Sequence, residues 1–507
     1  MHKVIVLISL FLLSLASQAQ DRRFVRYNCM PDIDVDASPS DARSLPAHRR
    51  LPQPKTDYDP TVSYPQLVIL MEFKDRQFTI EEPQTFYDRM LNEPGFNQGR
   101  GPGCVADYFR TQSSGRFNLQ FDVVGPVRIN YTYKGNDYGN DLFRKALLQA
   151  IDSLDIDLSR YDWDGNGVVE QVAYIYAGYG GNETAAVAEG SIWPNTSSFG
   201  SVTKDGVKAS NYTASPELFS TNKSCGIGTF CHEFSHSLGL PDIYPTSSTA
   251  VEFSIVDEWD LMDGGNFING GWCPPSYTAL EKMLLGWLTP VKLTEPTVIS
   301  NLKPTVDGGE VYQVINPGYN NEFFLIENRQ WKGWDLRLPG HGLLITHVDY
   351  RQTSWTSNTV NNDSKQHRFD IVCADNRTYD QWKAIIGDNN PYVSGHSRIL
   401  STAPYPYVDA DQNICNDSLT NLSTPAATLF HKNTDGTKML GMPITAIVEN
   451  ADSTVSFRFG EDTSTAIRDV NTPANRQRQA DYIIKLGINR NIVINKLTGK
   501  KYYESHH

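Results

Sequence analysis

Residues 232–242 read His-Glu-Phe-Ser-His-Ser-Leu-Gly-Leu-Pro-Asp and lie at the end of a stretch, residues 225–240, that is predicted to be a helix. Side chains four residues apart share one face of a helix, so His232 and His236 present two imidazoles to a single point. This is the arrangement that a tetrahedral zinc ion requires. Glu233 follows the first histidine, and its carboxylate can reach a metal-bound water without itself being a ligand.

The residues after the second histidine predict a sharp turn. Gly239 tolerates a positive φ and Pro241 cannot continue a helix, so the chain can turn back and bring Asp242 to the same metal. Three protein ligands leave a fourth position for water, as in catalytic zinc sites. A carboxylate from a later helix, such as Glu281, is the alternative third ligand. Further candidates are Asp257, Glu258 and Asp260.

This ligand set predicts a hydrolase. Zinc lowers the pKa of its water to about 7 and polarises a scissile carbonyl. Glu233 would accept the proton of that water and pass it to the leaving amine. We therefore expect a zinc-dependent endopeptidase that acts on protein or peptide substrates. The alternatives are a narrow peptidase that trims short peptides and a non-catalytic binding protein on a protease-like scaffold.

The pattern HExxHxxGxxD resembles that of the M6 family of secreted bacterial metalloproteases, the immune inhibitor A family, which is similar to the metzincins. Residues 259–265, Trp-Asp-Leu-Met-Asp-Gly-Gly, are similar to the WDLMSGG segment of that family, with Asp263 where serine is usual. The resemblance implies that Met262 is a Met-turn residue beneath the zinc. It also implies an α+β fold: a metzincin-like zinc protease domain with a mixed sheet and an active-site helix, followed by a mostly β region.

Composition and the N-terminus indicate an exported protein. Residues 1–19 have a basic start, an apolar run and small residues at the cleavage position, which predicts a signal peptide and a secreted protein. No later segment approaches 18 apolar residues, so we expect no membrane association in the mature form. The net charge of −13 argues against nucleic acid as a partner.

Composition and residue pattern divide the remaining chain into segments. Residues 20–62 are rich in Asp, Arg and Pro and are predicted to be a pro-segment and linker. The catalytic domain is placed at residues 63–291, with a buried strand at 67–71, a second strand at 171–178 and helices at 141–154 and 276–288. Short β-like runs then predict a β-rich domain at 292–460. Residues 461–507 form a C-terminal tail.

The sequence Tyr-Asp-Trp-Asp-Gly-Asn-Gly-Val-Val-Glu at residues 161–170 predicts a calcium loop that lacks the last ligand of an EF-hand. The resemblance to M6 proteases also implies calcium here. The candidate ligands are Asp162, Asp164, Asn166, the carbonyl of Val168, and Glu170.

Cys29 lies in Arg-Tyr-Asn-Cys-Met-Pro-Asp, which partly resembles the cysteine-switch sequence of matrix metalloproteases. A thiolate can occupy the water position of a zinc ion, so Cys29 is a candidate for latency. The alternatives are an ordinary cysteine and a nearby Asp that blocks the zinc instead. The seven cysteines leave at least one unpaired in a monomer. His341 and His347 lie far from residues 232–242 in the sequence and are expected to be structural, with a metal role as the alternative.

Overall fold

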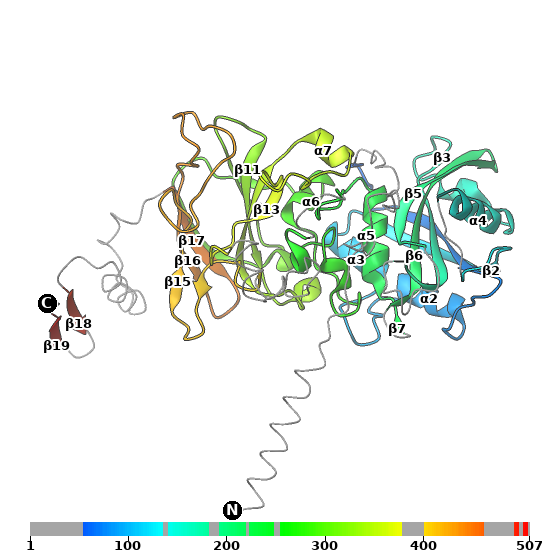
Figure 1. The fold of residues 1–507 in the computed structure, drawn as a ribbon, viewed down its shortest axis with the longest axis horizontal. Coiled ribbons are helices and arrows are strands. Elements are labelled where there is room, and N and C mark those ends of the chain that lie inside the picture. The colour runs from blue at the N-terminus through cyan, green and yellow to red at the C-terminus, as the bar shows by residue number, and fades with distance from the viewer. Residues whose placement is uncertain are drawn as a thin grey trace, which may run out of the picture.

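The computed structural model describes residues 54–134, 140–181, 192–219, 223–247, 254–377, 400–460, 491–495 and 500–504. Strands of an N-terminal sheet lie at one end of the molecule, β-rich layers lie at the other, and α5 and α6 lie between them (Figure 1). The helices are α2 (Pro83–Asn92), α3 (Val105–Gln112), α4 (Asn140–Asp152), α5 (Ile227–Ser237), α6 (Ala279–Leu284) and α7 (Gln352–Thr356). Single 3-10 turns occur at Leu158–Tyr161, Asp257–Trp259, Gly265–Phe267, Thr305–Asp307 and Gly333–Asp335.

The N-terminal sheet is mixed and has the order β2-β1-β4-β6-β3, with β5 and β7 also pairing with β6. The strands of the main path pair in parallel, whereas β5 and β7 are antiparallel to β6. Their bounds are β1 (Ser63–Glu72), β2 (Asn118–Arg128), β3 (Val168–Val169), β4 (Val172–Tyr179), β5 (Asn195–Lys204), β6 (Val207–Phe219) and β7 (Lys223–Ser224).

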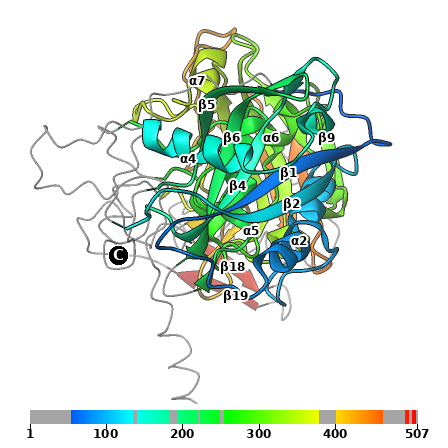
Figure 2. The ribbon, with the colours of Figure 1, turned by 90° about the vertical axis from the view of Figure 1, so that its right-hand side faces the viewer.

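Both faces of this sheet are covered, because successive side chains of a strand point to opposite faces. Leu67 and Ile69 of β1 pack in the same core as α4, whereas Val68 and Leu70 pack in the core that contains α5. Helices α4 and α2 accordingly lie on opposite sides of β1 and β4 (Figure 2). The continuous apolar run at residues 67–71 is therefore a strand buried on both faces, as predicted.

The second half of the described chain is mostly β. A five-stranded sheet has the order β13-β12-β11-β10-β8, and a three-stranded sheet has the order β16-β17-β9. Their bounds are β8 (Val291–Lys292), β9 (Thr297–Leu302), β10 (Tyr312–Ile315), β11 (Glu322–Arg329), β12 (Gly342–Asp349), β13 (Phe369–Ile371), β16 (Ile444–Glu449) and β17 (Val455–Phe459). Two hairpins complete the strands: β14 (Tyr407–Val408) with β15 (Ile414–Asn416), and β18 (Asn491–Asn495) with β19 (Lys500–Glu504). Helices and mixed sheets together give the predicted α+β class.

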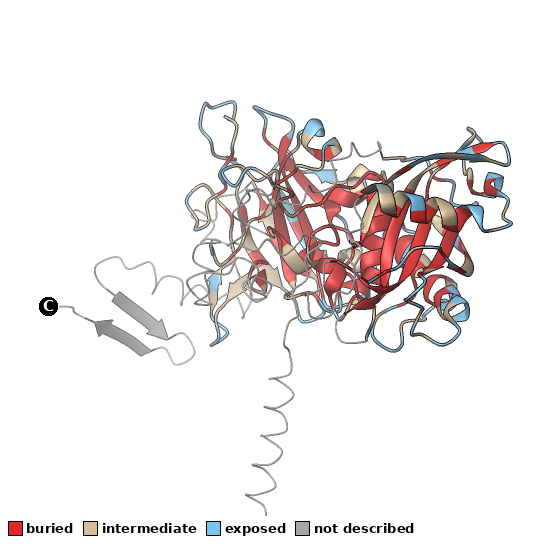
Figure 3. Ribbon diagram, turned by 45° about the vertical axis from the view of Figure 1, so that its right-hand side comes forward, coloured by how far each residue is buried: buried red, intermediate tan, exposed pale blue. Residues whose placement is uncertain are grey.

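One apolar core crosses the predicted boundary at residue 291. It contains Tyr277 and Trp287 from before the boundary, and Phe323 and Leu325 from after it. Buried residues accordingly run from the N-terminal sheet into the β-rich layers (Figure 3). Tyr58, from the predicted pro-segment, also packs in this core. The domain boundaries themselves stay predictions.

Helix α6 is shorter than the predicted helix at residues 276–288. Thr278 and Glu281 form a reciprocal capping box that starts the helix at Ala279. Gly286 then adopts φ 69°, which ends the helical path. Across the described residues, no helix combines the length and the apolar content that crossing a membrane requires.

Candidate metal centre

Helix α5 is buried along its length and packs very closely against the loop that follows the 3-10 turn at Asp257–Trp259. Every residue from Ile227 to His236 is buried. A Cβ at Gly228 would lie 1.9 Å from the Asn266 carbonyl oxygen, and one at Gly226 would lie 2.2 Å from the Gly271 carbonyl carbon. Glycine is therefore required at both positions, and it lets the loop approach the histidines of α5.

Backbone carbonyls orient both imidazoles. The Nδ1 atom of His232 lies 2.9 Å from the Leu261 carbonyl, and that of His236 lies 2.8 Å from the Leu240 carbonyl. A carbonyl oxygen can only accept, so each Nδ1 must donate, and each Nε2 can bind a metal ion when it carries no proton. Metal-binding histidines are commonly held in this way.

The predicted turn brings Asp242 to the two histidines. Gly239 adopts φ 99°, and the chain leaves α5 there. The Oδ1 atom of Asp242 lies 3.2 Å from His232 Nε2 and 3.3 Å from His236 Nε2. Two ligand atoms on one tetrahedral zinc ion, with bonds of about 2.0–2.1 Å, would be about 3.3 Å apart. The three ligand atoms all lie within 4.8 Å of one another, a spacing that can hold one metal ion.

The charges of this cluster also fit a cation. His232 Nε2 and Asp242 Oδ1 are buried and have no hydrogen-bond partner. Burial opposes the charged form of His236, but the Asp242 carboxylate outweighs it and raises the pKa of His236 to about 9. Without a metal, a proton therefore compensates the buried carboxylate, and a divalent cation would displace that proton.

Glu233 is buried beside the cluster and is held by a strand residue. The Thr196 hydroxyl, on β5, lies 2.6 Å from the Glu233 carbonyl oxygen and 3.1 Å from its Oε2. Burial raises the pKa of Glu233, against the opposing effect of His232 and His236. No sequence pattern pointed to Thr196, because a lone threonine on an edge strand carries no motif.

Met262 is fully buried in the segment that contacts the histidine helix. Its carbonyl accepts a hydrogen bond from the Ile243 N–H at 2.9 Å, and the preceding Leu261 carbonyl holds His232. Asp263, which replaces the usual serine, closes a local loop through hydrogen bonds from the Ser254 hydroxyl and the N–H groups of Ile255 and Val256.

Glu281, the alternative third ligand, makes its contacts away from the two histidines, at the start of α6. Its carboxyl caps α6 through Thr278 and is hydrogen-bonded to Asp260. Burial raises the pKa of Glu281 well above its usual value, with the Asp260 carboxylate adding to the effect. Within the described ranges, the group of side chains whose spacing could hold a metal ion consists of His232, His236 and Asp242 and does not include Glu281. It also excludes the other three candidates, Asp257, Glu258 and Asp260.

The predicted calcium loop has a different character, because its side chains bind its own backbone. Asp162 accepts hydrogen bonds from the N–H groups of Asn166 and Gly167, at 3.1 and 2.8 Å. Asp164 pairs with Lys55 at 3.5 Å. Glu170 accepts from the Trp163 N–H, and Asn166 from the Val168 N–H. The prediction of calcium stays untested by this geometry.

This loop and the metal centre border one cavity of about 320 Å³. Burial raises the pKa of Glu170, on its wall, to about 7. The wall also includes His236 and residues of the predicted pro-segment. The lining residues are Lys55, Tyr58, Trp163, Asp164, Asn166, Val168, Val169, Glu170, Gln171, Thr196, Asn211, His236, Ser237 and Leu238.

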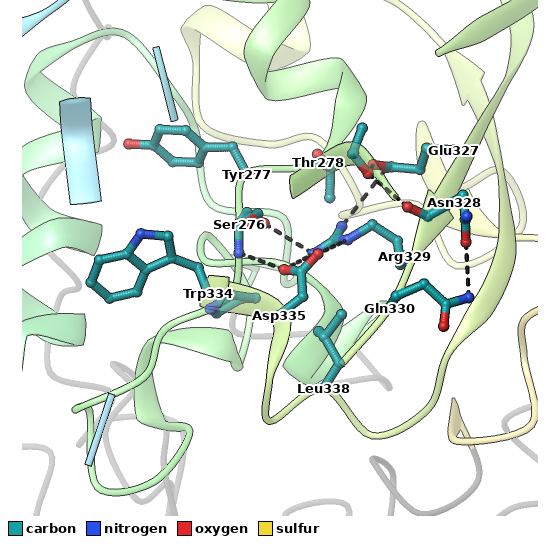
Figure 4. A network of polar contacts seen from close by, with 12 residues as sticks. Ser276, Tyr277, Thr278, Glu327, Asn328, Arg329, Gln330, Trp334, Asp335 and Leu338 are labelled. Atoms are coloured by element: carbon teal, nitrogen blue, oxygen red, sulfur yellow. Dashed lines mark hydrogen bonds and ion pairs between the residues drawn. The ribbon is translucent and has the colours of Figure 1, made fainter. Parts of the chain in front are cut away.

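A buried polar network joins Arg329 of β11 to Asp335 and Ser276 (Figure 4). Arg329 of β11 donates to Asp335 through Nε and Nη2, at 2.7 and 2.8 Å, and to the Ser276 carbonyl at 3.1 Å. The Ser276 N–H donates back to Asp335 at 2.9 Å. The next residue, Tyr277, is hydrogen-bonded through its hydroxyl to Ser235 of α5. The network thus supports the helix that carries both histidines.

The remaining candidates fall outside the centre. His341 and His347 pair with Glu449 and Glu322 at 2.6 and 2.9 Å, as expected for structural histidines. Cys29 and the predicted signal peptide lie outside the described residues. The six cysteines that the structure describes are all free thiols.

Comparisons with known proteins find similarity to metalloproteases. Residues 66–283 match the family model of the immune inhibitor A peptidase M6 catalytic domain. Pre-pro-metalloprotease PrtV of Vibrio cholerae serotype O1 is 25% identical over 245 residues, which are 40% of this chain and 26% of that protein. Immune inhibitor A of Bacillus thuringiensis subsp. alesti is 25% identical over 274 residues, 43% of this chain and 38% of that protein. The matches thus span well under half of each relative. Residues 66–283 are thus similar to the catalytic domain of M6 peptidases.

Proposed function

We propose that this protein is a secreted zinc-dependent endopeptidase in which His232, His236 and Asp242 hold the ion and Glu233 is the general base. One observation carries the proposal. Three buried acceptors converge on one point, and two of their facing atoms have no hydrogen-bond partner. Burying such acceptors without a donor is unfavourable, so the site is suited to a cation. The family match supports a peptidase as the use of that cation.

When bound, zinc would supply Lewis-acid chemistry, activating water and polarising the scissile carbonyl. Glu233 would take the proton of the attacking water on its carboxylate and return it to the leaving amine. The Thr196 hydroxyl orients that carboxylate from β5. Burial raises the pKa of Glu233, which favours a group that must both accept and release a proton.

The wider assignment follows from the same domain. Met262, buried in the segment that holds His232, supports a metzincin-like Met-turn. Protein or peptide substrates follow from the peptidase family, and the acidic chain disfavours nucleic acid. We assign residues 63–291 to the catalytic domain and 292–460 to a β-rich domain that packs against it. Residues 1–19 are assigned as a signal peptide, and 461–507 as a tail.

Two accessory roles remain part of the proposal. Calcium at Asp162–Glu170 would stabilise a loop that borders the cavity beside His236. Cys29 would keep the enzyme latent by occupying the water position. Unchanged latency in Cys29→Ala would remove the second role.

The test compares wild type with Glu233→Ala after removal of residues 20–53, which keeps Tyr58 in the core and separates activity from latency. Zinc content and casein digestion are measured on both proteins. We expect equal zinc in both and digestion by the wild type alone. If both bind zinc and neither digests casein, the scaffold is a binding protein and the endopeptidase proposal is wrong.

A further inference from the structure

Asn358 contacts the third ligand of the metal centre from the β-rich half of the chain. It lies just after α7, 116 residues beyond Asp242. Its Nδ2 donates to Asp242 Oδ2 at 2.6 Å, and its Oδ1 accepts from the Asp242 N–H at 2.7 Å. A backbone N–H can only donate and an ionised carboxylate can only accept, so the orientation of the amide is determined.

This double contact fixes how the carboxylate is rotated. With Oδ2 bound to Asn358, Oδ1 is the oxygen that faces His232 Nε2 and His236 Nε2, at 3.2 and 3.3 Å. Rotation of the carboxylate would have to break the 2.6 Å hydrogen bond. Among the described side chains, Asn358 is the one that donates a hydrogen bond to Asp242 in addition to the histidine contacts.

The residue type suits the position. Asn358 has φ 55°, in the left-handed region that asparagine tolerates better than most residues. Two further asparagine side chains in the segment after α7 also bind the segment that follows Asp242. Asn361 donates to the Ile243 carbonyl at 2.9 Å, and Asn362 accepts from the Thr246 N–H at 2.7 Å. These contacts hold the loop after Asp242 but do not touch its carboxylate.

We propose that Asn358 is a positioning residue of the metal centre, which presents the Oδ1 atom of Asp242 to the ion. The inference rests on the proposed function, because it requires that Asp242 is a zinc ligand. It makes residues of the β-rich region necessary for metal binding. Groups that orient a metal ligand in this way typically contribute about 10–100-fold in metal affinity.

The test is zinc affinity, measured by competition with a chromogenic chelator, together with the visible spectrum of the cobalt-substituted protein. Asn358→Gly removes the amide and keeps the positive φ accessible. Asn358→Asp keeps the shape and removes the donor to Oδ2. Asn362→Ala is the matched control, because it breaks a contact between the same segments without touching Asp242. Circular dichroism of the metal-free proteins shows which variants fold.

We expect roughly 10–100-fold weaker zinc binding and an altered cobalt spectrum in the folded Asn358 variants. The Asn362→Ala control should stay within about twofold of wild type. Wild-type affinity and spectrum in either folded Asn358 variant would overturn the inference, as would an equal loss in the control. If the wild type itself binds no zinc, the proposed function fails as well, so the two failures are distinguishable.

Discussion

The metal centre and the Arg329 network are both built from buried charged side chains, but their charges are compensated differently. In the network, Asp335 receives two hydrogen bonds from Arg329 and one from the Ser276 N–H. In the metal centre, the Oδ1 atom of Asp242 faces two imidazole nitrogens, and among the described residues no Arg or Lys pairs with it. Where the chain supplies its own cation the cluster is structural, and where it supplies only acceptors the cluster can bind an ion.

The largest expected effect comes from removing the internal cation. Arg329→Met leaves the buried Asp335 carboxylate uncompensated, so we expect the free energy of unfolding to fall by about 3–5 kcal/mol. Urea unfolding at fixed zinc concentration measures it. Arg128→Met breaks the exposed pair with Glu72 and should cost less than about 1 kcal/mol. Equal losses in both variants would show that the buried pair has no special role.

The second effect concerns the cation that the metal centre is proposed to bind. Asp242→Ala should weaken zinc binding by more than about 100-fold, since even groups that only orient a ligand contribute 10–100-fold. Equilibrium dialysis against zinc measures the affinity. Glu281→Gln should bind zinc like the wild type. A loss in Glu281→Gln with full binding in Asp242→Ala would reverse the assignment of the third ligand.

A smaller effect is expected from a third kind of charge compensation. Here the buried carboxyl groups of Asp260 and Glu281 share a proton. Burial raises the pKa of both Asp260 and Glu281, so the folded chain retains a proton that the unfolded chain releases above about pH 4. Stability should therefore fall as pH rises from about 4 towards neutral, by up to about 1.4 kcal/mol per pH unit for one proton. Unfolding at several pH values should give a flatter profile for Glu281→Gln. An unchanged slope in that variant would contradict the shared proton.

The smallest effect is expected at the Asp162–Glu170 loop, whose side chains already bind the loop backbone. If calcium binds there, calcium at roughly five times its Kd should stabilise the fold by about 1 kcal/mol. Thermal unfolding with calcium and with a chelator measures this, and Asp162→Ala should abolish the difference. If calcium does not change the thermal unfolding of the wild type, the loop is an ordinary turn and the calcium proposal is wrong.

The sequence by itself determined the features that depend on local geometry. The spacing of His232, Glu233 and His236 follows from the helical repeat, and the departure of the chain follows from Gly239. The buried strand at residues 67–71 follows from its apolar run. Each signal lies within a dozen residues, so no knowledge of distant contacts was needed.

Only the tertiary structure decided which carboxylate faces the histidines and what holds it there. Asp242 and Glu281 were both open in the sequence, and it is the capping of α6 and the pairing with Asp260 that engage Glu281 elsewhere. Thr196 and Asn358 approach the centre from positions 37 and 116 residues away from their partners. Such contacts arise from the packing of whole layers, so no local pattern of residues predicts them.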